Sequence, residues 1–296
     1  MIKTIDEYLD QLKVELKDSD SATIQDAVSD AEDHLRAALI GLKQEQPETS
    51  EDDALGQVVE QYGTPSETAS AYREVERRTA PNLMRQEQTQ NSGLARFFGV
   101  YTDPRAWGAL LYMLIAFVTG ILYFTWAVTG VSLSVSFLIF IFGFPFAVIF
   151  LLSVRGLALI EGRLVEALLG VRMPRRPLFF EKGLKLLERL KLLVMDRHIW
   201  FSILYMLIQF VLGIVYFVSI VVVLSFSLSA IAIPFLQEFS QIGAITSGNG
   251  AQYFLPTWSY PLLVFGGFML WTTFMNIARW VGQLHGKMAK ALLVTE

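Results

Sequence analysis

The sequence contains no cysteine, only three histidines and little charge for its length. The lack of cysteine excludes disulfides, thiolate metal sites and cysteine nucleophiles. His34, His198 and His285 are far apart and lack ligand spacing, so we expect no metal site and no cofactor. Charged residues make up 18% of the chain and hydrophobic residues 53%, whereas soluble domains carry about 25% charge. This composition is typical of a membrane protein.

The charge is divided unevenly along the chain. Residues 1–90 hold 9 basic and 20 acidic side chains, a net charge of −11, and residues 91–296 hold 15 and 8, a net charge of +7. The first thirty residues are too charged to contain the apolar core of a secretory signal. We therefore expect an acidic domain that stays on the side of the membrane where it is made, followed by a basic membrane body.

Residues 1–80 have the pattern of a small helical domain. Apolar residues recur at helical spacing in several segments, and capping boxes begin at Ser50 and Thr64. The segments "YLDQLKVEL", "IQDAVSDAEDHLRAAL" and "LGQVVEQYGTPSETASAY" resemble the HAAS-type signalling domain of bacteria. The resemblance implies a PadR-like transcription regulator as partner, and an unrelated acidic helical bundle is the alternative. Residues 81–102 are predicted to be a linker.

Four uncharged runs predict four spans: 106–128, 137–154, 200–223 and 260–277. At 1.5 Å per residue in a helix, about 20 residues cross ~30 Å of hydrocarbon. The predicted fold is therefore all-α, with a cytosolic helical bundle and a four-span transmembrane bundle in 103–296.

The membrane body repeats itself. "DPRAWGALLYMLIAFVTGILYF" from Asp103 aligns without a gap with "DRHIWFSILYMLIQFVLGIVYF" from Asp196, and "RGLALIEGRLVEALLG" from Arg155 aligns with "RWVGQLHGKMAKALLV" from Arg279. We interpret 103–174 and 196–296 as two parallel repeats, each a hairpin followed by an amphipathic helix. The second repeat carries an insertion at about 230–266.

Lysine and arginine predict the orientation. The loops at 130–136 and 224–259 contain neither, and every other flank is basic, which predicts a multi-pass plasma-membrane protein with both termini cytosolic. The basic stretch 172–191, with interspersed phenylalanine and leucine, predicts an interfacial helix attracted to anionic lipid. Because these charges lie beside the bilayer, we expect no direct contact with nucleic acid.

The body also resembles a known bacterial and archaeal family, the "putative sensor" domain. The resemblance rests on "TDPRAWGALLYMLIAFVTGILYF", "GFP" at 143–145 and "VRGLALIEGRLVEALLGVRMP" at 154–174, and it covers about 98–295. Arg197 and His198 depart from the Pro-Arg pair of the first repeat. Members occur alone or fused to histidine kinases, and here no kinase motif follows.

Two groups of residues are candidates for specific roles. The first consists of helix caps and interface anchors, with ligand contact as the alternative for the aspartates: Asp103, Trp107, Asp196, Trp200, Arg155 and Arg279. We expect the two arginines to extend toward lipid headgroups. The second is an aromatic ligand site in the insertion, with a plain interfacial cover as the alternative: Phe235, Glu238, Phe239, Tyr253 and Trp258.

We find no nucleophile–base pair, no phosphate loop and no buried transmembrane carboxylate, and we expect Glu161, Glu166 and Glu188 to be solvated. The sequence therefore predicts a non-enzymatic sensor that relays a membrane signal to a cytosolic regulator. A scaffold or accessory subunit of a membrane complex such as an ABC exporter is the first alternative. A small transporter is disfavoured by the expected lack of intramembrane polar groups. Homo-oligomerisation stays open.

Overall fold

The computed structural model describes residues 4–46, 48, 50–79, 93–137, 143–174, 191, 193–241, 243–246, 248 and 252–294. Residues 81–92 of the predicted linker (81–102) lie outside this range, as does most of the predicted interfacial helix (172–191), including Glu188. Part of the insertion lies outside it as well. The chain forms two compact units, which are described separately. The first unit comprises 1–87, 127–205 and 286–296, and the second comprises 88–126 and 206–285.

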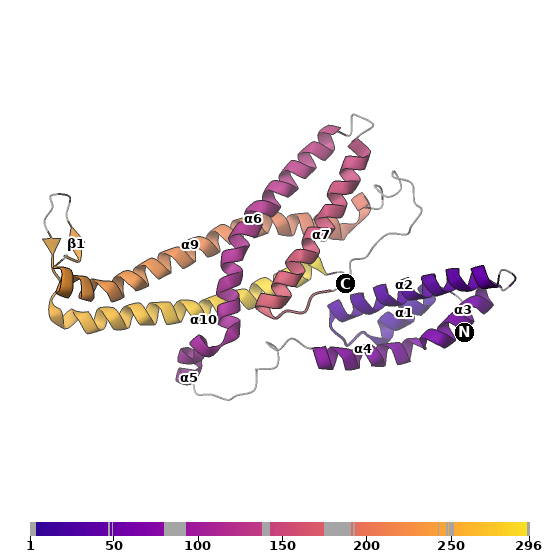
Figure 1. Ribbon diagram of the computed structural model, residues 1–296, viewed down its shortest axis with the longest axis horizontal. Helices are drawn as coiled ribbons and strands as arrows, with labels where there is room; N and C mark the ends of the chain where they lie inside the picture. Colours follow the sequence, from indigo (N-terminus) through magenta and orange to yellow (C-terminus); the bar gives the residue numbers. More distant parts are fainter. Residues whose placement is uncertain are drawn as a thin grey trace. The chain divides into compact units, whose positions relative to one another are not determined.

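The head of the first unit contains α1 (Ile5–Glu15), α2 (Ser21–Glu45), α3 (Glu51–Tyr62) and α4 (Pro65–Thr79), as Figure 1 shows. Each amphipathic helix buries one apolar face, and the shared core includes Leu12, Leu16 and Leu35. Tyr8 is fully buried in this core and donates a hydrogen bond to Gly63 O at 2.8 Å. Burial raises the pKa of the Tyr8 phenol. Gly63 lies at φ 108° in the turn before α4, a conformation that favours glycine.

Thr64 and Glu67 form a capping box at the start of α4. The Thr64 backbone N–H donates to Glu67 Oε2 at 2.9 Å, and the Glu67 N–H donates to Thr64 Oγ1 at 3.3 Å. The hydrogen bonds from the Thr64 backbone N–H and hydroxyl hold the pKa of Glu67 below its ordinary value. Two donors at the helix N-terminus are thereby satisfied.

This box predicts a pH-dependent stability difference in the isolated head, residues 1–80. Because the folded pKa of Glu67 is depressed, its stabilisation is present above the unfolded pKa and disappears as the pH falls through the folded value. We expect Glu67→Gln to lower the melting temperature near neutral pH and to match the wild type in acid, as measured by circular dichroism. Glu60→Gln, at an exposed position of α3, is the control. A Glu67→Gln difference that persists unchanged in acid would contradict the role of this carboxylate.

The membrane body contains four helices long and apolar enough to cross a bilayer within the described residues. They are α6 (Pro104–Phe137), α7 (Gly143–Leu169), α9 (Arg197–Ser240) and α10 (Tyr260–Leu293). The short elements are α5 (Gly93–Phe98), η1 (Gly99–Thr102), η2 (Thr257–Ser259) and the paired strands β1 (Ile245–Thr246) and β2 (Gln252–Tyr253). The predicted all-α class and four spans are confirmed.

Several predicted boundaries are wrong. The expected loop 130–136 lies inside α6, and residues 155–169 continue α7 rather than forming a separate amphipathic helix. The expected loop 224–259 is likewise helical in its first part, because α9 continues to Ser240. Hydropathy measures side-chain composition, whereas a helix ends where its backbone hydrogen bonds end. Charged or serine-rich segments can therefore continue a spanning helix.

In the second unit, α6 and α9 cross at two glycines. A Cβ atom on Gly120 would lie 2.8 Å from Gln209 O, and one on Gly213 would lie 2.5 Å from Ala116 O. Two stacked aromatic pairs flank this crossing, Phe117 with Phe217 and Phe124 with Phe210, each with ring centroids 4.4 Å apart. The glycines allow the two backbones to touch.

Beyond this crossing, α9 and α10 run side by side (Figure 1). Ser227 Oγ donates to Gly267 O at 2.7 Å, and a Cβ atom on Gly267 would lie 2.8 Å from Ser227 O. The close approach of α9 to α10 therefore also depends on a glycine, like the crossing of α6 and α9.

Candidate functional site

The second unit buries a histidine between three spanning helices. His285 of α10 is 3% exposed. Its Nε2 lies 2.7 Å from the Tyr112 hydroxyl of α6, and its Nδ1 lies 3.0 Å from the Tyr216 hydroxyl of α9. A neutral imidazole donates at one nitrogen and accepts at the other. His285 therefore joins α6 to α9 through two different hydrogen bonds.

Gln209 extends this network and indicates which of its atoms donate and which accept. Its Nε2 donates to the Tyr112 hydroxyl oxygen at 3.2 Å. The Tyr112 hydrogen can then be donated to His285 Nε2, which leaves Nδ1–H to donate to Tyr216. Every hydroxyl and imidazole nitrogen in this chain of bonds thus has a complementary partner. The neutral form of His285 satisfies this arrangement.

The first unit buries a carboxylate. Glu161 of α7 is 1% exposed, and Tyr205 of α9 donates to its Oε1 at 2.9 Å. The prediction that Glu161 is solvated is therefore wrong. Glu161 lies on an apolar-rich face of α7, and α9 covers it. Glu166, by contrast, is partly exposed and pairs with Arg163 at 3.1 Å.

These two contacts occupy corresponding positions of the sequence repeat. Tyr112 aligns with Tyr205, and His285 aligns with Glu161. Each repeat therefore supplies one tyrosine to an ionisable partner from an amphipathic segment, a histidine in one case and a carboxylate in the other. Ionisable residues inside spanning segments are costly and are commonly functional.

The predicted caps and anchors also make corresponding contacts. Asp103 Oδ1 accepts from the Arg105 backbone N–H, and Asp196 Oδ1 accepts from that of His198, each at 2.9 Å. Trp107 and Trp200 are half exposed and donate to carbonyls six residues earlier, Tyr101 O and Val194 O.

The arginines pair with these same aspartates, a contact that the sequence pattern did not predict. Arg279 contacts Asp103 at 3.0 Å within the second unit, and Arg155 contacts Asp196 within the first. Each pair joins an arginine of one sequence repeat to an aspartate of the other. The side chains are about one-fifth exposed. Ion pairing thus accounts for the charge that we expected to extend to lipid headgroups.

The aromatic ligand site of the insertion stays a prediction. Its five residues are all exposed on α9, β2 and η2: Phe235, Glu238, Phe239, Tyr253 and Trp258. Gln237 beside them is buried and accepts from the Leu255 N–H at 3.3 Å. Within the described residues, no three His, Cys, Asp or Glu side chains are grouped closely enough to hold a metal ion.

Four long apolar helices and buried polar contacts between them define a multi-pass helical membrane protein. The family model described as "Putative sensor" matches residues 112–293, which include all four spans in whole or in part. The chain belongs to this sensor family. No curated protein and no solved structure matches it.

Proposed function

We propose that the protein is a non-enzymatic membrane sensor that relays the state of its spanning helices to a cytosolic regulator through its acidic head. The observation that carries this proposal is the set of ion pairs between α2 and the membrane body. In the first unit, Asp26 lies 4.0 Å from Arg172, and both side chains are buried. Asp20, at the N-cap of α2, pairs with Lys290 in the last turn of α10.

These contacts join the start of α2 to the ends of two membrane helices. Arg172 follows α7 by three residues, and Lys290 belongs to α10. Separating opposite charges that are paired in a protein interior is unfavourable. A shift of α7 or α10 would therefore change the position or the stability of α2. This coupling supports the head as the output of the sensor.

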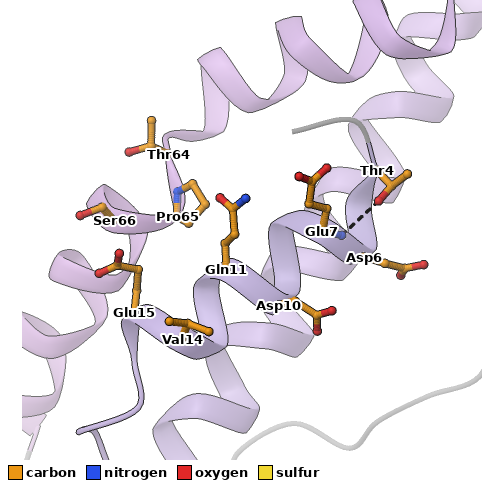
Figure 2. A pocket seen from close by; sticks show the side chains of 10 residues that line it. All are labelled: Thr4, Asp6, Glu7, Asp10, Gln11, Val14, Glu15, Thr64, Pro65 and Ser66. Carbon is orange, nitrogen blue, oxygen red and sulfur yellow. Dashed lines mark hydrogen bonds between the residues drawn. The ribbon is translucent and has the colours of Figure 1, made fainter. Parts of the chain in front are cut away.

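The head also carries a groove suited to a basic partner (Figure 2). The cavity of about 750 Å³ lies between α1 and the start of α4. Four acidic side chains and no basic side chain are among its ten lining residues, which include Asp6, Asp10 and Glu15. Carboxylates of one sign favour a positively charged segment. A regulator of the PadR-like class implied by the HAAS resemblance would bind here, with both termini of the protein cytosolic.

Co-purification of the intact protein from its native membrane tests this function. We expect a transcription regulator to be recovered with the wild type and reduced about tenfold with Asp10→Asn/Glu15→Gln. Asp33→Asn/Glu60→Gln removes the same charge at exposed positions outside the groove and should retain the regulator. Recovery of exporter subunits, unaffected by either variant, would instead favour the scaffold alternative. Recovery of no regulator would contradict the relay.

A transporter is the second candidate, because buried polar side chains lie on the long helices of the membrane body. Glu161, Gln209 and His285 are buried polar side chains on long apolar helices. Such groups occur along proton pathways in transporters. Proton flux into liposomes that contain the purified protein, measured with an enclosed pH-sensitive dye, would support this candidate.

A further inference from the structure

A small cavity in the first unit lies where α7 meets the start of α9. Its volume is about 80 Å³. One face of α7 forms one wall, from Arg155 to Gly162, and Asp196, His198 and Ser202 form the other. The volume corresponds to between two and three water molecules at about 30 Å³ each. It is too small for a typical organic ligand but large enough for one compact polar group.

The polar atoms of the cavity favour an anion. Asp196 is the one acidic side chain in the lining, and both of its oxygens are engaged, one by Arg155 and the other by the His198 backbone N–H. His198 Nδ1 is buried, and no hydrogen-bond partner for it lies among the described residues. Ser202 adds a hydroxyl from a buried side chain. The guanidinium, imidazole and hydroxyl together form a donor set for an oxyanion.

The rest of the lining is apolar. Leu159, Met173, Ile199 and Leu293 contribute to the walls. Such a lining suits a group whose charged end is followed by hydrocarbon. We propose that this cavity binds the phosphate group of a phospholipid. Arginine forms charge-assisted hydrogen bonds to phosphate oxygens, and free phosphate shares that chemistry, so the experiment must separate the two sources.

The sequence repeat explains why one site is expected rather than two. His198 and Ser202 align with Arg105 and Ala109 in the first repeat, and Leu159 aligns with Gln283 in the second. Ala109 is 1% exposed and has no hydroxyl. The corresponding position therefore lacks both the serine donor and the unpaired imidazole. The phosphate site is specific to the α7–α9 side of the repeat.

The inference rests on the proposed function, because it names the signal that the sensor would detect. Gln25 of α2 lines the same cavity, one residue before Asp26, and Met173 follows Arg172. A bound phosphate would thus touch the segments that carry the head contacts. Loading or emptying the cavity would bias the position of α2.

The test uses the full chain, purified in detergent and delipidated. Phosphatidylglycerol, phosphatidylcholine and inorganic phosphate are added separately, and retained lipid is measured by native mass spectrometry and stabilisation by thermal unfolding. We expect phosphatidylglycerol to bind and to raise the melting temperature. Ser202→Leu, which fills the cavity, and His198→Ala, which removes a donor, should each weaken retention about tenfold. Arg105→Ala, the aligned position of the first repeat, should not.

The outcomes separate the alternatives. Stabilisation by inorganic phosphate that Ser202→Leu abolishes would assign the site to free phosphate as well as to lipid. If phosphatidylglycerol and phosphatidylcholine both stabilise the protein and inorganic phosphate does not, the site binds the phosphodiester group of a lipid. Equal lipid retention by the wild type, Ser202→Leu and His198→Ala would overturn the inference. No regulator is present in this measurement, so it tests the lipid site independently of the relay. If the protein binds lipid but no regulator is recovered in the co-purification, the proposed function is contradicted and the lipid site is not.

Discussion

Replacing Gly213 or Gly120 by alanine should prevent the close packing of α6 on α9 and strongly destabilise the protein. The new methyl group would lie 2.5 Å from Ala116 O in the first variant and 2.8 Å from Gln209 O in the second. Both contacts are with backbone atoms, so no side-chain rotation relieves them. Overpacking a closely packed interface by one methyl costs about 1–3 kcal/mol or more. The helices must move apart, which also separates the flanking phenylalanine pairs.

Thermal unfolding in detergent, followed by size-exclusion chromatography, measures this effect. Gly156→Ala and Gly266→Ala are matched controls, because both glycines lie within spanning helices and have no atom within 4 Å of an added Cβ. We expect the controls to be neutral or stabilising by up to about 1 kcal/mol, since alanine favours the helix. A Gly213→Ala protein as stable as Gly266→Ala would show that the two backbones do not touch.

The second large effect is expected at His285. His285→Phe keeps an aromatic ring but removes both hydrogen-bonding nitrogens from Tyr112 and Tyr216. Each buried hydroxyl left without this partner costs about 1–3 kcal/mol, although hydrogen bonds between membrane helices average about 0.6 kcal/mol. We therefore expect a loss of about 1–3 kcal/mol in total, measured as a shift in the unfolding midpoint of the purified protein in mixed micelles.

A double-mutant cycle with Tyr216→Phe assigns this loss to the hydrogen bond. The combined variant should be more stable than the sum of the two single effects predicts, by about 0.6–1.7 kcal/mol. His34→Phe, at an exposed position of α2, is the control and should have little effect. Strictly additive losses would mean that His285 contributes through its volume rather than through its ring nitrogens.

The sequence predicted the spanning helices well because crossing a bilayer constrains composition over about 20 consecutive residues. It predicted their ends less well. Arg155 interrupts an apolar run, and the hydropathy pattern therefore placed a boundary there, although α7 continues to Leu169. A charged side chain makes one face of a helix more polar, but it does not interrupt the backbone hydrogen bonds of that helix.

The polar contacts could not be predicted from local pattern, since they depend on how helices face one another. Glu161 lies at an ordinary helical spacing, and only its contact with Tyr205 identifies it as buried. One signal was available in the alignment of the repeats. Tyr112 and Tyr205 are identical, and polar residues occupy both aligned positions, Glu161 and His285. Polar residues at both aligned positions of an otherwise apolar membrane body indicate that these side chains contact other helices within the protein.

The length of α9 has a consequence for the surrounding bilayer. Its 44 residues make a helix about 66 Å long, more than twice the ~30 Å hydrocarbon thickness. Pro234 lies inside it and cannot donate to the carbonyl of Ala230. That carbonyl needs water or a side chain, so we place the edge of the hydrocarbon near this turn. The apolar part of α9 before Pro234 is still longer than the hydrocarbon layer is thick. The helix must therefore tilt or the bilayer must thicken around it, at a cost of fractions of a kcal/mol for each ångström of mismatch.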